Sequence, residues 1–207
     1  YTMEDRDERE RLKNEVVRLQ LRIPKIPLKV RKLDPWLRLH LAAMRCEDAY
    51  AEFSRIFGLE GVRFPTETGQ TVDGVYRGEG PFWGMGGKFT VLLLEKESSF
   101  GRIKQRYLNG VGGDSSARFL FPKSDSMLFA AHVQSSSLSQ DGVLHCALAY
   151  NLVHNFVDGT SHYSFAVPIW LATGLGHAFA RAIDPKQNYF TEDKPFSTDE
   201  KDVWNWP

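Results

Sequence analysis

Four of the six histidines lie between residues 145 and 177, in a stretch rich in apolar residues. Imidazole nitrogens bind zinc, and a helix offers two of them to one metal when the histidines are four residues apart. A glutamate beside the first histidine then acts as the general base for a zinc-bound water. The segment LAYNLVHNF, residues 148–156, has only His154 of such a pair, and Tyr150 and Asn151 occupy the positions of the first histidine and the glutamate. This segment therefore supplies one zinc ligand and no base.

A third zinc ligand would come from a second helix. The segment PIWLATGLGHAF, residues 168–179, follows the pattern P-x-W-L-x-E-G-L-A, with Thr173 at the position of the glutamate ligand. Thr173 follows His154 by 19 residues. In this order and at this separation, the two segments resemble the metal-binding helices of gluzincin-type zinc metallopeptidases. The chain resembles in particular the peptidase-MA-like family, which includes a group of domains of unknown function.

The resemblance covers about residues 36–185. It includes a helix ending in FGLEG, a strand KFTVLLLEK, a short helix and a strand pair, in that order, ahead of the metal helix. It implies an α+β fold with a small mixed or antiparallel sheet and a zincin-like pair of buried helices. The vestigial positions of the metal site are then Tyr150, Asn151, His154 and Thr173.

Because one imidazole cannot hold zinc against water, the resemblance implies that catalytic, metal and cofactor sites are absent. In an alternative alignment, His145 is the first ligand, Cys146 occupies the position of the base and Ala149 that of the second ligand. This alignment also keeps only one histidine. We expect the vestigial side chains to hydrogen-bond to one another where the metal joined the helices. The domain would then be a catalytically inactive structural or protein-binding module with protein partners in a larger protein or complex.

The alternative function is a zinc-dependent metallopeptidase or other hydrolase with a non-standard ligand set. In that case the metal would be held by His154 together with His177 or His162. His145 cannot join His154, since residues nine apart lie about 180° apart around a helix.

The chain divides into three segments by composition. We expect residues 1–33 to form a charged helical arm with a Pro-containing linker and residues 186–207 to form a tail with Trp204 and Trp206. The resemblance implies that residues 34–185 between them are the metallopeptidase-like domain. Within the arm, apolar residues at three- and four-residue spacing form one narrow stripe, which predicts an exposed helix over 3–23. This stripe consists of Leu12, Val16, Leu19 and Ile23.

Local signals place the other elements. Asp34 and Pro35 begin a long helix that Gly58 ends. A nearly continuous apolar run over 88–96 predicts a buried strand. Ser98 or Ser99 caps a short helix through Tyr107. The remaining predictions are strand pieces around 72–76, a hairpin of ARFLFP with SMLFAAHV, a buried helix over 141–156, a loop from 157, a helix over 168–183, and turns in the glycine-rich stretches 80–87 and 109–116.

Composition gives no support for nucleic-acid binding or for a transmembrane helix. The 207 residues have a formal net charge of zero, so nothing in the overall charge favours nucleic acid. No run reaches the roughly 18 apolar residues of a transmembrane helix. Cys46 and Cys146 lie among apolar neighbours, which predicts buried free thiols. The sequence does not predict a compartment.

Overall fold

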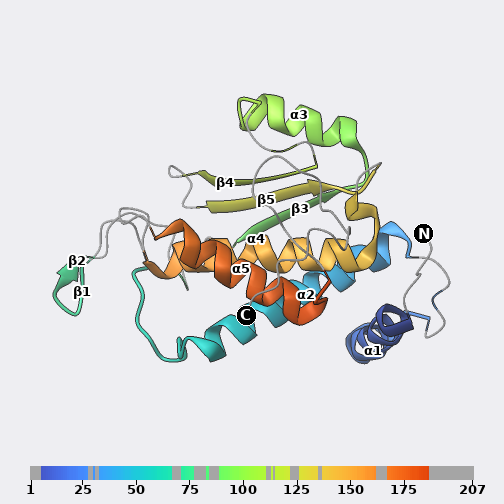
Figure 1. Cartoon of the computed structure of the whole chain (residues 1–207), viewed down its shortest axis with the longest axis horizontal. Coiled ribbons are helices and arrows are strands. Elements are labelled where there is room, and N and C mark those ends of the chain that lie inside the picture. Colours follow the sequence, from blue (N-terminus) through green and yellow to red (C-terminus); the bar gives the residue numbers. More distant parts are fainter. Residues whose placement is uncertain are drawn as a thin grey trace.

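The structure is a computed structural model that describes residues 6–27, 30, 33–66, 71–76, 83, 89–110, 113, 115–121, 126–134, 137–161 and 167–186. These residues form an α+β fold, as predicted (Figure 1). The elements are α1 (Arg6–Arg22), α2 (Pro35–Ile56), β1 (Thr71–Val72), β2 (Val75–Tyr76), β3 (Thr90–Leu94), α3 (Glu97–Tyr107), β4 (Ser116–Phe121), β5 (Ser126–His132), η2 (Ser137–Ser139), α4 (Asp141–Ser161) and α5 (Ile169–Ile183). None of the described helices is long and apolar enough to cross a membrane.

The main sheet has the strand order β3-β5-β4. β5 pairs parallel with β3 and antiparallel with β4, so the sheet is mixed and the predicted hairpin is confirmed. Alternate residues of β5 face opposite sides: Phe129 packs in the cluster of α4, whereas Leu128 packs with Phe100 of α3. The sheet therefore separates α3 from the helical layer of α2, α4 and α5 (Figure 1).

The buried strand predicted over 88–96 is an edge strand. β3 spans Thr90–Leu94, and its side chains are exposed or half-buried. The central strand is β5, where residues 127–132 are all buried. An apolar run indicates a strand but does not distinguish a central position from a partly covered edge.

α2 follows its sequence signals closely. The Asp34 side chain accepts a hydrogen bond from the Leu37 N–H at 2.9 Å, with Pro35 in the first turn. Gly58, just after the helix, has a φ of 61°, which a glycine adopts without strain. α3 differs, because Lys96 rather than Ser98 or Ser99 precedes its first residue and the Lys96 side chain makes no capping hydrogen bond. The Glu97 N–H instead donates to Gln134 Oε1 at 3.2 Å.

α4 is the central helix and packs against β5, α2 and α5. It continues to Ser161, so the loop predicted from residue 157 begins later. Val157 is buried in a cluster with Phe53, Trp83 and Phe156. The Gly159 carbonyl also accepts a hydrogen bond from the Trp83 N–H at 2.7 Å. These tertiary contacts hold a segment whose composition is typical of a loop.

α1 is not an exposed arm. Its predicted stripe exists, but the stripe is buried in one cluster with apolar residues of α2 (Leu12, Val16, Leu19, Leu37, Leu41 and Met44). Ile26 and Leu33, in the predicted linker, belong to the same cluster. A single apolar stripe indicates that one face of a helix is covered by another surface. In this chain that surface is formed by α2 and the segment that connects α1 to it.

Candidate functional site

The predicted site lies where α4 packs against α5. Three aromatic rings meet there: the Tyr150 centroid is 4.7 Å from that of His154 and 5.2 Å from that of His177. Gly176 of α5 lies directly against them, since a Cβ at this glycine would be 2.8 Å from Tyr150 Cδ2 and 3.1 Å from His154 Cδ2. The sequence thus predicted correctly that Tyr150 and His154 face α5.

Among the described residues, the hydrogen-bonded network predicted for the vestigial positions is not formed by Asn151, His154 or Thr173. The Asn151 amide donates to the Ala147 carbonyl of its own helix at 2.8 Å. His154 Nε2 and Thr173 Oγ1 are buried and have no hydrogen-bond partner among the described residues. Asn151 is satisfied locally because an asparagine in a helix can reach the carbonyl four residues earlier. At these positions the two helices are therefore joined by ring packing.

Both histidines of this contact are neutral near pH 7. Burial is the main cause that lowers the pKa of His154 to about 4, and the nearby Arg118 and His177 lower it further. Burial and then Arg181 lower the pKa of His177. A neutral imidazole retains a lone pair for a metal. However, no group of three histidine, cysteine, aspartate or glutamate side chains in the described part of the chain could hold a metal ion. His162, the other candidate ligand, lies outside the described residues.

His145 lies elsewhere on α4, as its nine-residue separation from His154 predicts. Its Nδ1 is 3.7 Å from Glu15 Oε1, and burial followed by Arg45 and Arg11 lowers its pKa to about 2. The alternative alignment with His145 as first ligand therefore places that ligand in a separate environment.

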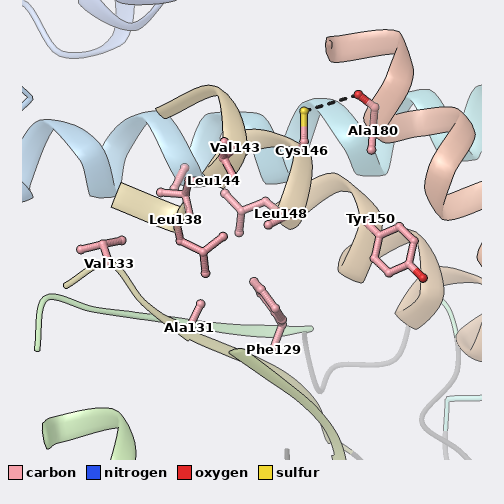
Figure 2. Close-up of a cluster of buried hydrophobic side chains, with 12 residues drawn as sticks. Phe129, Ala131, Val133, Leu138, Val143, Leu144, Cys146, Leu148, Tyr150 and Ala180 are labelled. Carbon is pink, nitrogen blue, oxygen red and sulfur yellow. Dashed lines mark hydrogen bonds between the residues drawn. The ribbon is translucent and has the colours of Figure 1, made fainter. Parts of the chain in front are cut away.

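The two cysteines are free, as predicted, and Cys146 is buried, whereas Cys46 is half-buried. Burial raises the pKa of both thiols to about 12, so neither forms a reactive thiolate near pH 7. The Cys146 thiol instead donates to the Ala180 carbonyl of α5 at 3.5 Å, in the apolar cluster that joins α4 to α5 and β5 (Figure 2).

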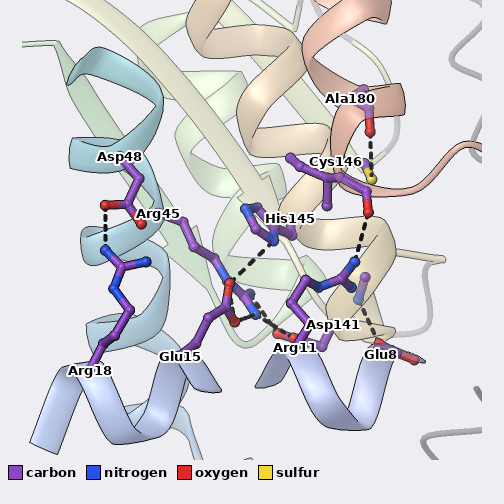
Figure 3. Close-up of polar contacts among 12 residues, drawn as sticks. Glu8, Arg11, Glu15, Arg18, Arg45, Asp48, Asp141, His145, Cys146 and Ala180 are labelled. Atoms are coloured by element: carbon purple, nitrogen blue, oxygen red, sulfur yellow. Dashed lines mark hydrogen bonds and ion pairs between the residues drawn. The ribbon is translucent and has the colours of Figure 1, made fainter. Parts of the chain in front are cut away.

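Sequence reasoning missed a buried ionic cluster on the other side of α4. Arg45 of α2 is 3% exposed and lies between Glu15 of α1 and Asp141 at the start of α4 (Figure 3). The signal was present, because Arg45 follows Leu41 by four residues and so continues the apolar face of α2.

An exposed apolar patch at the start of α5 was also missed. It consists of Ile169, Trp170 and Leu171, which are 77%, 72% and 37% exposed. Three consecutive bulky residues cannot all face one core from a helix, which was the available signal. Trp204 and Trp206 of the C-terminal tail lie outside the described residues.

The fold and this contact define an α+β domain in which the Tyr150 ring lies between α4 and α5. No protein-family model, no curated protein and no solved structure matches the chain. The gluzincin resemblance thus rests on the sequence segments 148–156 and 168–179 and stays a prediction.

Thr173→Val distinguishes ring packing from a hydrogen-bonded network. Valine has nearly the same shape, and the hydroxyl that it removes is buried without a partner among the described residues. We expect the free energy of unfolding to stay the same or to rise by up to about 1 kcal/mol, because a desolvated polar atom is lost. Urea denaturation followed by circular dichroism measures this. A decrease of about 1 kcal/mol or more would indicate that Thr173 makes a stabilising hydrogen bond.

Proposed function

We propose that the chain is a catalytically inactive, metallopeptidase-like domain that binds other proteins through the start of α5. The observation that carries this proposal is the patch of Ile169, Trp170 and Leu171. Contiguous exposed apolar residues are unusual on a protein surface without a partner. Tryptophan is also among the residues that dominate binding energy at interfaces.

The α4–α5 contact supports the inactive part of the proposal. In the resemblance, metal ligands face each other across these two helices. Here the Tyr150 ring packs between His154 and His177 and against Gly176. The helices are therefore already in van der Waals contact, and these side chains include no glutamate to act as the base for a metal-bound water. A fold can retain such a helix pair without the chemistry of its site.

Site-specific photocrosslinking tests the binding surface. A benzophenone amino acid is introduced at Trp170 and, as a matched control, at Leu39 of α2, which is 55% exposed. In cells that express the chain, we expect a discrete protein adduct from position 170 and none from position 39. With the crosslinked protein purified, Trp170→Ser is expected to weaken its affinity about thirtyfold or more, as the loss of a central aromatic anchor does. Leu39→Ser is expected to leave that affinity unchanged.

Two outcomes contradict the proposal. Equal adducts from both positions, or a partner whose affinity does not change with Trp170→Ser, would exclude the start of α5 as the binding surface. Stoichiometric zinc in the purified protein, lost together with peptide hydrolysis in His154→Ala, would establish the alternative function of a zinc-dependent hydrolase.

A further inference from the structure

The two halves of α5 are held to the rest of the domain in different ways. In the second half, Ala180 is fully buried, and its carbonyl accepts a hydrogen bond from the Cys146 thiol at 3.5 Å (Figure 2). The carbonyl of Ile183, the last residue of the helix, accepts another from Arg11 Nη1 at 2.9 Å. This half is therefore fixed by apolar packing and by hydrogen bonds to α4 and α1.

The first half, residues 169–176, makes a less complete contact with α4, and we call it the α5 lid. Ile169 and Trp170 are 77% and 72% exposed, so the first turn adds little apolar burial. Thr173 Oγ1 and His154 Nε2, one on each helix, are buried without a hydrogen-bond partner among the described residues. A polar atom that is removed from water without a partner costs free energy. These two groups therefore weaken the closed position of the lid, since water would satisfy them if the lid moved.

Apolar packing holds the lid closed. Ala172 and Leu175 pack in the aromatic cluster that contains Phe156. Gly174 and Gly176 follow or flank these contacts, close to the point where the lid meets the fixed half. Glycine lowers the stability of a helix interior, so α5 bends more easily here than along its second half.

The lid covers part of a polar face on α4. This face consists of Asn151, His154, Asn155 and Asp158, whose three- and four-residue spacing places them on one side of the helix. Gly176 lies directly against the ring of His154. Asn155 is 1% exposed, and its Nδ2 has no hydrogen-bond partner among the described residues. The face reaches the surface at Asp158, whose side chain is 23% exposed. A small movement of the lid would thus connect the buried polar atoms to solvent.

We propose that residues 169–176 act as a lid, which opens from α4 while the second half of α5 stays in place, and so exposes the polar face of α4 to solvent. Opening gives water to Thr173 and His154, and its main cost is the apolar burial of Ala172 and Leu175. Local opening of this kind requires less free energy than unfolding of the domain. A polar ligand of this face would enter through the open form, so the lid controls access to it. The lid does not require that Trp170 binds a protein.

Amide hydrogen exchange in the full-length chain, followed by NMR, tests the opening. The N–H groups of residues 173–176 bond to carbonyls of the lid, whereas those of residues 181–183 bond to carbonyls of the fixed half, because each bond spans four residues. We expect residues 173–176 to exchange about tenfold faster or more, after correction for their intrinsic rates.

Thr173→Val links this exchange to the unpartnered hydroxyl. Valine keeps the shape of the side chain, and removal of the buried polar atom makes opening less favourable. We expect exchange of residues 173–176 to slow about fivefold or more, and that of residues 181–183 to change less. The matched control is Thr160→Val on α4. The Thr160 hydroxyl already donates to the Val157 carbonyl at 2.9 Å, so its removal should not slow exchange in the lid.

Chemical modification of His154 shows whether opening also uncovers α4. Diethyl pyrocarbonate acylates neutral imidazole, and peptide mass spectrometry measures the rate at each histidine. Because His154 is covered in the closed form, we expect its modification at pH 7 to be limited by opening. Thr173→Val should therefore slow it by about the same factor as the amide exchange, and Thr160→Val should not slow it.

Equal exchange of residues 173–176 and 181–183 would overturn the proposal, and so would a Thr173→Val effect no larger than that of Thr160→Val. Slower amide exchange without slower modification of His154 would overturn it too, since α5 would then fray without uncovering α4. None of these outcomes changes the photocrosslinking result at Trp170, so the lid and the proposed function are tested separately.

Discussion

Replacing Arg45 with methionine is expected to lower the free energy of unfolding by about 3–5 kcal/mol. Methionine fills a similar volume, but it leaves the Glu15 and Asp141 carboxylates facing each other in a buried position without a cation. The matched control is Arg18→Met, which breaks an ion pair whose side chains are 55% and 46% exposed. Exposed pairs contribute only about 0–1 kcal/mol, so this control should change little. Urea denaturation measures both variants.

Combining Arg45→Met with Glu15→Leu and Asp141→Leu provides a further test. We expect this triple variant to recover most of the lost stability, because an apolar cluster replaces a buried charge that lacks its partner. If Arg45→Met and Arg18→Met cost the same, the cluster is hydrated and does not hold α1 to the body. A two-state transition with unchanged urea dependence is required in every variant, since partial release of α1 alone would alter that dependence.

The elements that the sequence predicted well are those with local signals at both ends. α2 has Asp34 at its start and Gly58 just after its end, and the hairpin of β4 and β5 consists of two apolar runs joined by a short polar segment. Caps and turns act within a few residues, so a single sequence contains all the information that they need.

The differences arise where distant contacts decide the structure. The end of α4 packs in an aromatic cluster that includes Trp83, a residue far from this helix in the sequence. The burial of α1 depends on ion pairs between residues far apart in the sequence. Glu15 and Arg45 are 30 residues apart, and Arg45 and Asp141 are 96 residues apart. Periodicity shows that α1 has an apolar face but does not identify the surface that covers it.

The candidate site was predicted only in part, because it too depends on contacts between distant segments of the chain. Helical spacing placed Tyr150 and His154 on one face of α4, and the resemblance led us to expect that this face meets α5, which it does. It did not show that Asn151 would hydrogen-bond to its own helix, nor that Gly176 would let the Tyr150 ring lie against the α5 backbone. These features depend on the distance between the helices, which residue types alone do not determine.

Gly176 and Gly174 together test how closely α4 and α5 are packed. Gly174→Ala is expected to raise the free energy of unfolding by about 1 kcal/mol, because alanine favours the helix and its Cβ would meet no atom within 4 Å. Gly176→Ala gains the same helix propensity, but its Cβ would lie 2.8 and 3.0 Å from two atoms of the buried Tyr150 ring. Such overpacking typically costs about 1–3 kcal/mol. The two substitutions, two residues apart on one helix, should therefore differ by about that amount in denaturation experiments.

Tyr150→Leu assigns this difference to the tyrosine ring. The smaller side chain leaves room beside Gly176, so Gly176→Ala should cost less in the Tyr150→Leu background than in the wild type, whereas Gly174→Ala should have the same effect in both. Residues in contact commonly show coupling of about 0.5–3 kcal/mol in such a cycle. Additive effects for Gly176→Ala would mean that the Tyr150 ring does not fill the space between the helices. The main structural support for an inactive site would then be lost, and the zinc measurement with His154→Ala would become the decisive experiment.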